Sequence, residues 1–326
     1  MRVSVVGAGV AGLVAASELI ARGVEVEVIE RGSSVGERAA SWLAGGMLAP
    51  YCERESAEEI VATLGAQAVE WWDKHLPGEV VRHGTLVVAP SRDVGELDRF
   101  ARRTHHFEWR DEAGIAALEP DLGGRFRKGL FFKDEAHVDP RRAMRGLGRA
   151  LGLKGARLRY EVEIDPAQAA GERVLDCRGF AARADLPGLR GVRGEMMIVR
   201  CRDVRLSRPV RLMHPRIPLY VVPRAEDRFM IGATMIESDD RGPMTARSAV
   251  DLLNAAYALH PAFAEAEIVE MGADVRPSFS DNIPRLIEEG RVLRLNGMYR
   301  HGYLLAPACA ARAADILLGT AEGTFP

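Results

Sequence analysis

Hydrophobic positions near the start of the chain follow first the pattern of a buried strand, then that of a helix, and then that of a second strand. Residues 2–6 (RVSVV) are short, β-branched and bounded by a glycine, which is typical of a buried parallel strand. Between Val10 and Arg22 apolar residues recur at helical spacing, and Gly23 follows where a helix commonly ends. The run VEVEVIE then alternates as far as Glu30. The pattern predicts a β-α-β unit.

Further along, the patterning predicts a change of architecture and then a return. Helices are expected at 57–75 and 93–103 and after Asp139, a typical N-cap residue, and strands are expected near 85–89, 129–133, 157–162 and 173–179. Strand-like segments (EMMIVRC, PLYVVPR, RFMIGAT) then dominate between 194 and 234, which suggests an inserted antiparallel lobe. The strand-like segment RVLRLNG and a helix expected at 307–318 then predict a return to α/β architecture.

Three glycines, Gly7, Gly9 and Gly12, stand at the first strand-to-helix turn with G-x-G-x-x-G spacing. Gly7 permits the tight turn, Gly9 lets a pyrophosphate approach the amides at the helix N-terminus, and Gly12 allows close packing of helix on strand. Glu30 stands where a carboxylate can accept hydrogen bonds from an adenosine ribose and would repel a 2′-phosphate. A plain tight turn is the alternative, but the flanking strands and Gly23 favour a seat for FAD or NAD.

Composition excludes several classes of function. The 326 residues are 47% hydrophobic and 28% charged with a net charge of -2, so no general attraction to nucleic acid or to an anionic membrane surface is expected. No uncharged apolar stretch is long enough to span a bilayer. Four dispersed cysteines form no C-x-x-C pair, which argues against a zinc ribbon or a disulfide scaffold. We therefore expect a cytoplasmic protein without a metal site.

A long connection, residues 31–51, follows the β-α-β unit. It is rich in glycine and small residues, and a loop of this length in a compact fold is more often functional than idle. Gly45 and Gly46 would let the backbone lie against a flat ring. The alternative is that residues 31–51 form a surface loop without a function.

Taken together, four blocks resemble the FAD-dependent amino-acid oxidase family, in particular the glycine oxidases of thiamine biosynthesis. The blocks are GAGVAGLVAASELIARGVEVEVIE, LAGGMLAP, YVVPRAEDRFMIGAT with VRPSFSDNIP, and NGMYRHGYLLAPA, and they span almost the whole chain in family order. The resemblance implies an α/β fold with a Rossmann-like FAD-binding domain (1–80, 138–187 and 265–326). An inserted, largely antiparallel β substrate domain would comprise 81–137 and 188–264.

The resemblance also implies which residues contact FAD. The ADP half would lie on the glycine turn with its ribose at the end of the second strand, while the flavin would meet the long loop and the segment that opens the C-terminal helix. No cysteine stands where the related sarcosine oxidases attach their flavin, so noncovalent FAD is expected. The expected contacts are Gly7, Gly9, Val10, Ala11, Gly12, Glu30, Arg31, Ser41, Gly46, Met47, Val162, Met298, Tyr299, His301, Gly302, Tyr303 and Leu304.

Two arginines recognise the substrate near the ring in this family, and the resemblance assigns that role to Arg276 and Arg300, with Tyr220 in the substrate lobe. A planar guanidinium suits a carboxylate, and Pro277 could hold Arg276 at a cleft. With 44 Lys and Arg residues present, either arginine alone could be an ordinary surface residue. Tyr220 would also fit any half-buried strand.

Two departures from the family pattern concern the cofactor and the substrate. The turn at the end of the returning strand reads DCRGFAAR (176–183) instead of a small-residue A-x-G, so the backbone near Asp176 and Arg178 is expected to approach the cofactor differently. Trp42 and Leu43 stand where small residues are common, and they are expected to narrow the site.

The resemblance therefore predicts FAD-dependent oxidation of glycine, sarcosine or a small D-amino acid to an imine. Dioxygen would be reduced to hydrogen peroxide, and the product would supply the thiazole of thiamine. The expected partners are a small amino acid and dioxygen, with no nucleic acid, no membrane span and a possible homo-oligomer. Two alternatives stay open: a D-amino-acid or sarcosine dehydrogenase that uses another electron acceptor, and a flavin-binding protein without turnover.

Overall fold

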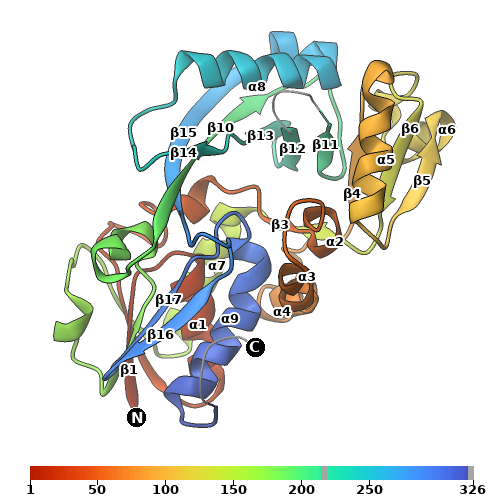
Figure 1. Ribbon diagram of the computed structural model, residues 1–326. Coiled ribbons are helices and arrows are strands. Elements are labelled where there is room, and N and C mark those ends of the chain that lie inside the picture. Colours follow the sequence, from red (N-terminus) through yellow and green to blue (C-terminus); the bar gives the residue numbers. More distant parts are fainter. Residues whose placement is uncertain (214–218, 322–326) are drawn as a thin grey trace.

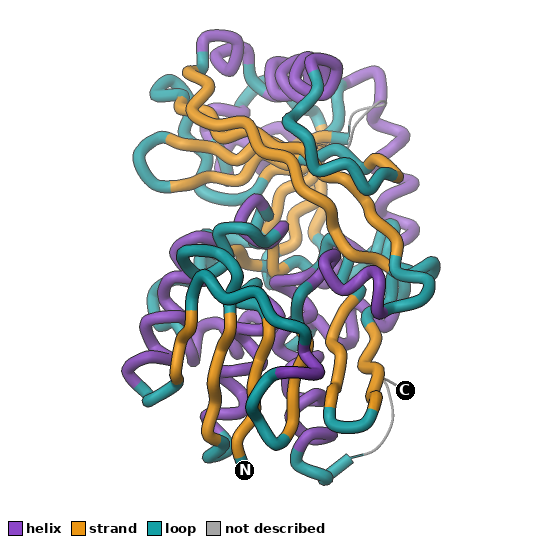
Figure 2. Tube along the Cα trace, turned by 90° about the vertical axis from the view of Figure 1, so that its left-hand side faces the viewer, coloured by secondary structure: helices purple, strands orange, loops and turns teal. Residues whose placement is uncertain are grey.

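Two sheets, one above the other, dominate the computed structural model, which describes residues 1–213 and 219–321 (Figures 1 and 2). The lower sheet has six strands in the order β16-β17-β9-β1-β2-β8, all parallel to their neighbours except β16. Its strands are β1 (Arg2–Val6), β2 (Glu25–Ile29), β8 (Arg157–Arg159), β9 (Arg173–Asp176), β16 (Arg285–Glu289) and β17 (Val292–Asn296).

Helices pack around this parallel sheet and enclose the largest core of the molecule. Apolar side chains of α1, α7 and α9 meet those of β1 and β2 there. The helices of this part are α1 (Val10–Ala21), α2 (Pro50–Glu53), α3 (Glu59–Gly65), α4 (Ala68–His75), α7 (Pro140–Leu153) and α9 (Gly302–Leu317), and the short strands β3 (Met47–Leu48) and β7 (Ala136–His137) pair beside them. Among the described residues, no helix is both long and apolar enough to cross a membrane.

The upper sheet is antiparallel except where β11 pairs with β4. Helix α8 (Ala246–Leu259) covers one face and packs its apolar residues on the strands (Figure 1). The strands are β4 (Thr85–Val88), β5 (Glu108–Asp111), β6 (Lys128–Phe132), β10 (Arg190–Arg200), β11 (Val210–Leu212), β12 (Leu219–Arg224), β13 (Arg228–Gly232), β14 (Ile236–Glu237) and β15 (Glu267–Ser278), with α5 (Val94–Arg103) and α6 (Glu112–Leu118) beside β4 to β6.

The chain leaves the lower sheet twice, and both excursions contribute strands to the upper one. The exact domain limits remain a prediction, but one of them conflicts with the sheets. The predicted limit at 265 assigns residues 267–278 to the FAD-binding domain, whereas β15 pairs with β10 along its whole length. The sequence did not predict a strand at β15. Several of its residues are exposed at the edge of the sheet, so apolar and polar positions do not alternate clearly along it.

Two helices differ from their predicted bounds for local reasons. The helix expected at 57–75 is broken into α3 and α4. The helix expected to begin at Pro307 begins at Gly302 and contains that proline. Pro307 has no N–H to donate to the carbonyl of Tyr303, four residues earlier, and that carbonyl instead accepts from Trp72 Nε1 at 2.9 Å. A tertiary contact thus satisfies the group that the proline leaves free.

The first turn has the close packing that its glycines predict. Gly7 adopts a φ of +103°, which favours glycine. A Cβ atom placed on Gly12 would lie 1.9 Å from the carbonyl oxygen of Gly7, so only glycine fits where α1 meets the end of β1.

Replacing Gly12 with alanine is expected to lower the free energy of unfolding by at least about 2 kcal/mol, because the new methyl group collides with backbone that cannot move aside cheaply. Gly95→Ala is the control, since a Cβ there meets nothing within 4 Å and the residue lies in α5. Urea unfolding of both variants checks this. Equal stability of the two would contradict the packing argument.

Candidate active site

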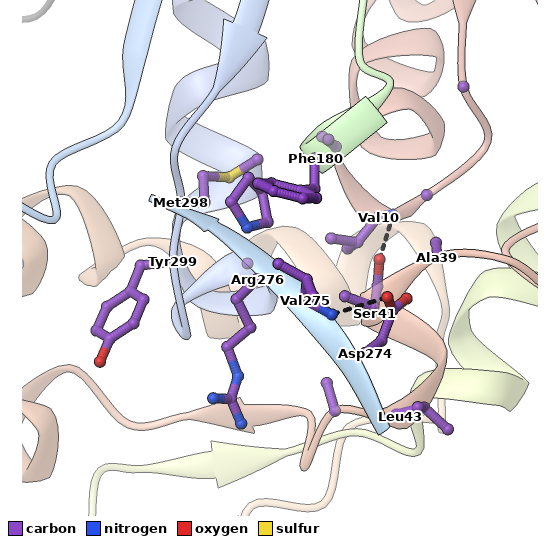
Figure 3. Close-up of a pocket in the computed structure, with 18 of the residues that line it drawn as sticks. Val10, Ala39, Ser41, Leu43, Phe180, Asp274, Val275, Arg276, Met298 and Tyr299 are labelled. Carbon is purple, nitrogen blue, oxygen red and sulfur yellow. Dashed lines mark hydrogen bonds between the residues drawn. The ribbon is translucent and has the colours of Figure 1, made fainter. Parts of the chain in front are cut away.

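A single cavity between the two sheets is lined by almost all the residues that the sequence singled out. Val10 and Ser41 lie on one side of it, and Arg276 and Tyr299 on the other (Figure 3). Of the predicted site residues, only Gly12 does not line the cavity, because it faces the carbonyl of Gly7.

One end of the cavity, formed by the first turn and Glu30, has the features of a dinucleotide seat. The buried carboxylate of Glu30 accepts hydrogen bonds from the N–H groups of Ala8 and Gly32, each at 2.7 Å. A carboxylate has about four acceptor positions, so capacity remains for ribose hydroxyls. The N-terminus of α1 meets the cavity at Val10, whose N–H donates to Ser41 Oγ at 3.2 Å. The residues present therefore fit an adenosine diphosphate moiety.

The loop that includes Gly45, Gly46 and Met47 is held against the cavity from both domains. Gly46 has a φ of +71°, and a Cβ there would lie 2.1 Å from the carbonyl oxygen of Val138. Arg224 of β12 donates to the carbonyl of Gly45 at 2.8 Å. The path of the loop is therefore determined by packing, and its backbone can present a flat surface to a ring.

The opposite end of the cavity, which we call the substrate end, is lined by Glu53, Tyr220, Arg276 and Arg300. Arg276 lies on β15, and its guanidinium covers Gly194 of β10, where a Cβ would come within 2.1 Å of Nη2. Burial and the nearby charge of Arg300 lower the pKa of Arg276 to about 10, so it remains a cation at neutral pH. Within residues 1–213 and 219–321, no carboxylate oxygen lies within 4.0 Å of it.

Arg276 is positioned by Thr234. Its Nη1 donates to the carbonyl of Thr234 at 3.0 Å. Thr234 is tied in turn to Glu195, because its hydroxyl accepts from Glu195 N at 2.9 Å and its own N–H donates to Glu195 O at 3.2 Å. The guanidinium therefore projects from a well-anchored part of the sheet toward the cavity.

Arg300 also lines the cavity, but its guanidinium already has an internal partner. Nη2 lies 2.6 Å from Glu53 Oε2, and Nη1 lies 3.2 Å from the sulfur of Met235. Burial opposes the ionisation of Glu53, yet the nearby cations, Arg300 first, outweigh that effect and lower its pKa to about 2. The sequence predicted that both arginines are available to a substrate carboxylate. Of the two, only Arg276 has no carboxylate partner among the described residues.

Tyr220 contributes to the same network. Its hydroxyl donates to Glu53 Oε1 at 2.6 Å and accepts from Arg211 Nη1 at 2.9 Å. Arg211 also pairs with Glu55 at 2.9 Å. His301 lies 3.6 Å from Glu53, and burial lowers its pKa to about 4, so its imidazole is neutral at pH 7.

Sequence reasoning missed several of these residues. Glu53 stands three residues after the end of the LAGGMLAP block, and that position was the available signal. Arg211 and Thr234 stand in strand-like segments where nothing marks their function. Glu55, one partner of Arg211, is 156 positions away, and Arg276, the partner of Thr234, is 42 positions away, so only the fold brings these contacts together at the cavity.

The two departures have clear structural outcomes. Leu43 lines the cavity, whereas Trp42 does not and instead has Arg141 and Arg145 over its ring. After β9, Asp176 pairs with Arg178, and the backbone comes so close to the first turn that a Cβ on Gly7 would lie 2.7 Å from the carbonyl oxygen of Cys177.

Comparison with known proteins agrees with this geometry. The family model "FAD dependent oxidoreductase" matches residues 2–316. A protein of Rhizobium etli named "Putative thiamine biosynthesis oxidoreductase ThiO" is 60% identical over 98% of this chain and 97% of its own length. A glycine oxidase of Pseudomonas aeruginosa is 30% identical over 98% and 95%. The crystal structure of glycine oxidase from Geobacillus kaustophilus aligns with a TM-score of 0.82 at 25% identity, over 98% and 96% of the two chains, which confirms the predicted α/β fold.

Glu135 supports the short helix that carries Glu53. Its Oε1 accepts from the N–H groups of Tyr51 and Cys52, at 3.1 and 2.6 Å. The side chain is 1% exposed, and burial, the dominant effect, raises its pKa to about 8. The native protein therefore retains a proton between pH 4.5 and about 8 that the unfolded chain releases, and this group's contribution to stability is lost as the pH rises through that window.

Glu135→Gln is therefore expected to match the wild type at pH 5 and to exceed its free energy of unfolding by about 4 kcal/mol at pH 8.5, since glutamine stays neutral and keeps the acceptor oxygen. Urea unfolding at the two pH values measures this. Glu119→Gln is the control, because it breaks a buried ion pair with Arg208 and should destabilise at both values. A Glu135 variant that is less stable at pH 8.5 would refute the assignment.

Proposed function

Since the chain belongs to the FAD-dependent oxidoreductase family, whose model matches residues 2–316, we propose that it oxidises glycine or a similarly small amino acid at the α-carbon. The chain is thus an oxidoreductase with FAD as its cofactor. One observation carries the choice of substrate class. Arg276, a cation without a carboxylate partner among the described residues, stands across the cavity from the dinucleotide seat (Figure 3).

Names of relatives support the same substrate class. Glycine oxidases of Bacillus licheniformis and Pseudomonas aeruginosa match nearly the whole chain, and the Rhizobium etli relative is named for thiamine biosynthesis. We therefore assign the product to the supply of the thiamine thiazole. Dioxygen is the proposed electron acceptor.

The protein's contribution is binding and orientation. Glu30, Gly7 and the amides at the start of α1 would hold the ADP half of FAD, and the loop at Gly46 and the segment at Met298 would contact the ring. Bound FAD would supply the acceptor for a hydride from the substrate α-carbon, with dioxygen as the proposed final electron acceptor and hydrogen peroxide as its product.

Arg276 would bind the substrate carboxylate and turn the α-carbon toward the ring. Water then hydrolyses the imine product to the oxo acid and ammonia. His301 is neutral at pH 7, and Tyr220 donates its proton to Glu53. Hydride transfer requires a neutral substrate amine, because the nitrogen lone pair forms the new C=N bond, and a substrate amine that enters neutral needs no side-chain base.

Holoenzyme mixed with glycine without oxygen should lose its flavin absorbance, and admission of air should restore it with one peroxide formed per glycine consumed. Flavin that bleaches without oxygen but is not reoxidised by air would identify a different acceptor. Flavin that no small amino acid bleaches would remove the proposal.

Arg276→Met should lower kcat/KM for glycine by about 100-fold or more, while FAD stays bound, because a charge-assisted carboxylate contact is lost. Arg200→Met is the matched control, since Arg200 lies on the same β10–β15 pair and forms an ion pair with Glu267 outside the cavity. Steady-state oxygen consumption and the flavin content of both variants measure the effect. Unchanged turnover by the Arg276 variant would exclude its role.

A further inference from the structure

We infer that Glu53 makes the site select its substrates by charge. Glu53 holds Arg300 in an ion pair, and Arg276 is then the guanidinium at the substrate end that is available to a carboxylate. The site then selects ligands with one carboxylate over ligands with two. This inference rests on the proposed function, because it names the charge class that the same cavity takes.

The two oxygens of Glu53 have different partners inside the cavity. Oε1 accepts a hydrogen bond from Tyr220 at 2.6 Å, whereas Oε2 forms an ion pair with Arg300 Nη2 at 2.6 Å without a hydrogen bond of good geometry. The residue is only 6% exposed although it lines the cavity. Water therefore screens the pair weakly, and a ligand carboxylate could reach Arg300 only by replacing Glu53 or by lying against its negative charge.

Contacts behind Glu53 prevent it from swinging away. Tyr220 lies between Glu53 and Arg211, whose guanidinium is 5.1 Å from the centre of the Tyr220 ring. Arg211 is itself 2% exposed and paired with Glu55. A carboxylate held by this chain of contacts is part of the wall, and its position does not depend on the ligand.

The charges at the substrate end match one anionic group. Arg276 and Arg300 contribute two positive charges and Glu53 one negative charge, so the net charge is +1. A monocarboxylate neutralises it. A second ligand carboxylate would remain without a cation at this end and would lose its hydration, which makes the binding of a dianion unfavourable.

Removal of the Glu53 charge should therefore release Arg300 for a second carboxylate. The test uses FAD-loaded protein and two non-reactive ligands that differ by one carboxylate, acetate and malonate, with the perturbation of flavin absorbance as the readout. The wild type should bind acetate at least about tenfold more tightly than malonate. Glu53→Gln should change the ratio of the two dissociation constants by about tenfold or more in favour of malonate.

Two further variants isolate the cause. Glu119→Gln breaks a buried ion pair with Arg208 outside the cavity and should leave the ratio unchanged. Glu53→Gln combined with Arg300→Gln should lose the gain for malonate, because the released guanidinium is gone. If Glu53→Gln does not fold, wild-type protein that binds malonate as tightly as acetate would still overturn the inference.

Three results would overturn the inference: wild-type protein that binds malonate as tightly as acetate, a Glu53→Gln variant with an unchanged ratio, or a gain for malonate that survives loss of Arg300. The second result together with a large rise in KM for glycine would point to Glu53 as a contact for the substrate amine. Because these measurements need no turnover, failure of glycine oxidation would not affect them, and failure of the ligand preference would leave the proposed function standing.

Discussion

The close approach of α1 to the end of β1 is the constraint on which the site depends. Gly12 faces the carbonyl of Gly7 with no room for a side chain, and this contact places the start of the helix at the cavity. The exposed amides at that point form one end of the site, and Glu30 completes it from the neighbouring strand. This packing thus places helix amides at the edge of the parallel sheet where they can bind an anion.

The upper sheet supplies what the parallel sheet cannot, a rigid platform facing the cofactor end. The β10–β15 pair brings Arg276 to the cavity, and Gly194 on the partner strand leaves room for its guanidinium. Thr234 then holds the side chain in place. The proposed recognition of a substrate carboxylate by Arg276 would thus depend on backbone pairing between segments far apart in the chain, and strands instead of loops would set its precision.

Charge balance inside the cavity connects binding to selectivity. A buried arginine is costly unless it is paired, and two unpaired arginines close together would repel each other. Glu53 relieves that repulsion by pairing with Arg300, while the proximity of Arg300 still lowers the pKa of Arg276. In the proposal above, the same carboxylate both offsets the charge of Arg300 and limits the charge of the ligand that the site accepts.

Much of this protein was determined by local sequence. The β-α-β unit, the roles of Gly7 and Gly12 and the N-cap at Asp139 depend on neighbours within a few residues, and the structure confirms them. The start of α9, the sheet that contains β15 and the pairing of Arg300 with Glu53 were decided only by tertiary structure. Each depends on contacts with distant residues, such as Trp72 with the Tyr303 carbonyl, and hydrophobic periodicity carries no information about which distant groups will meet.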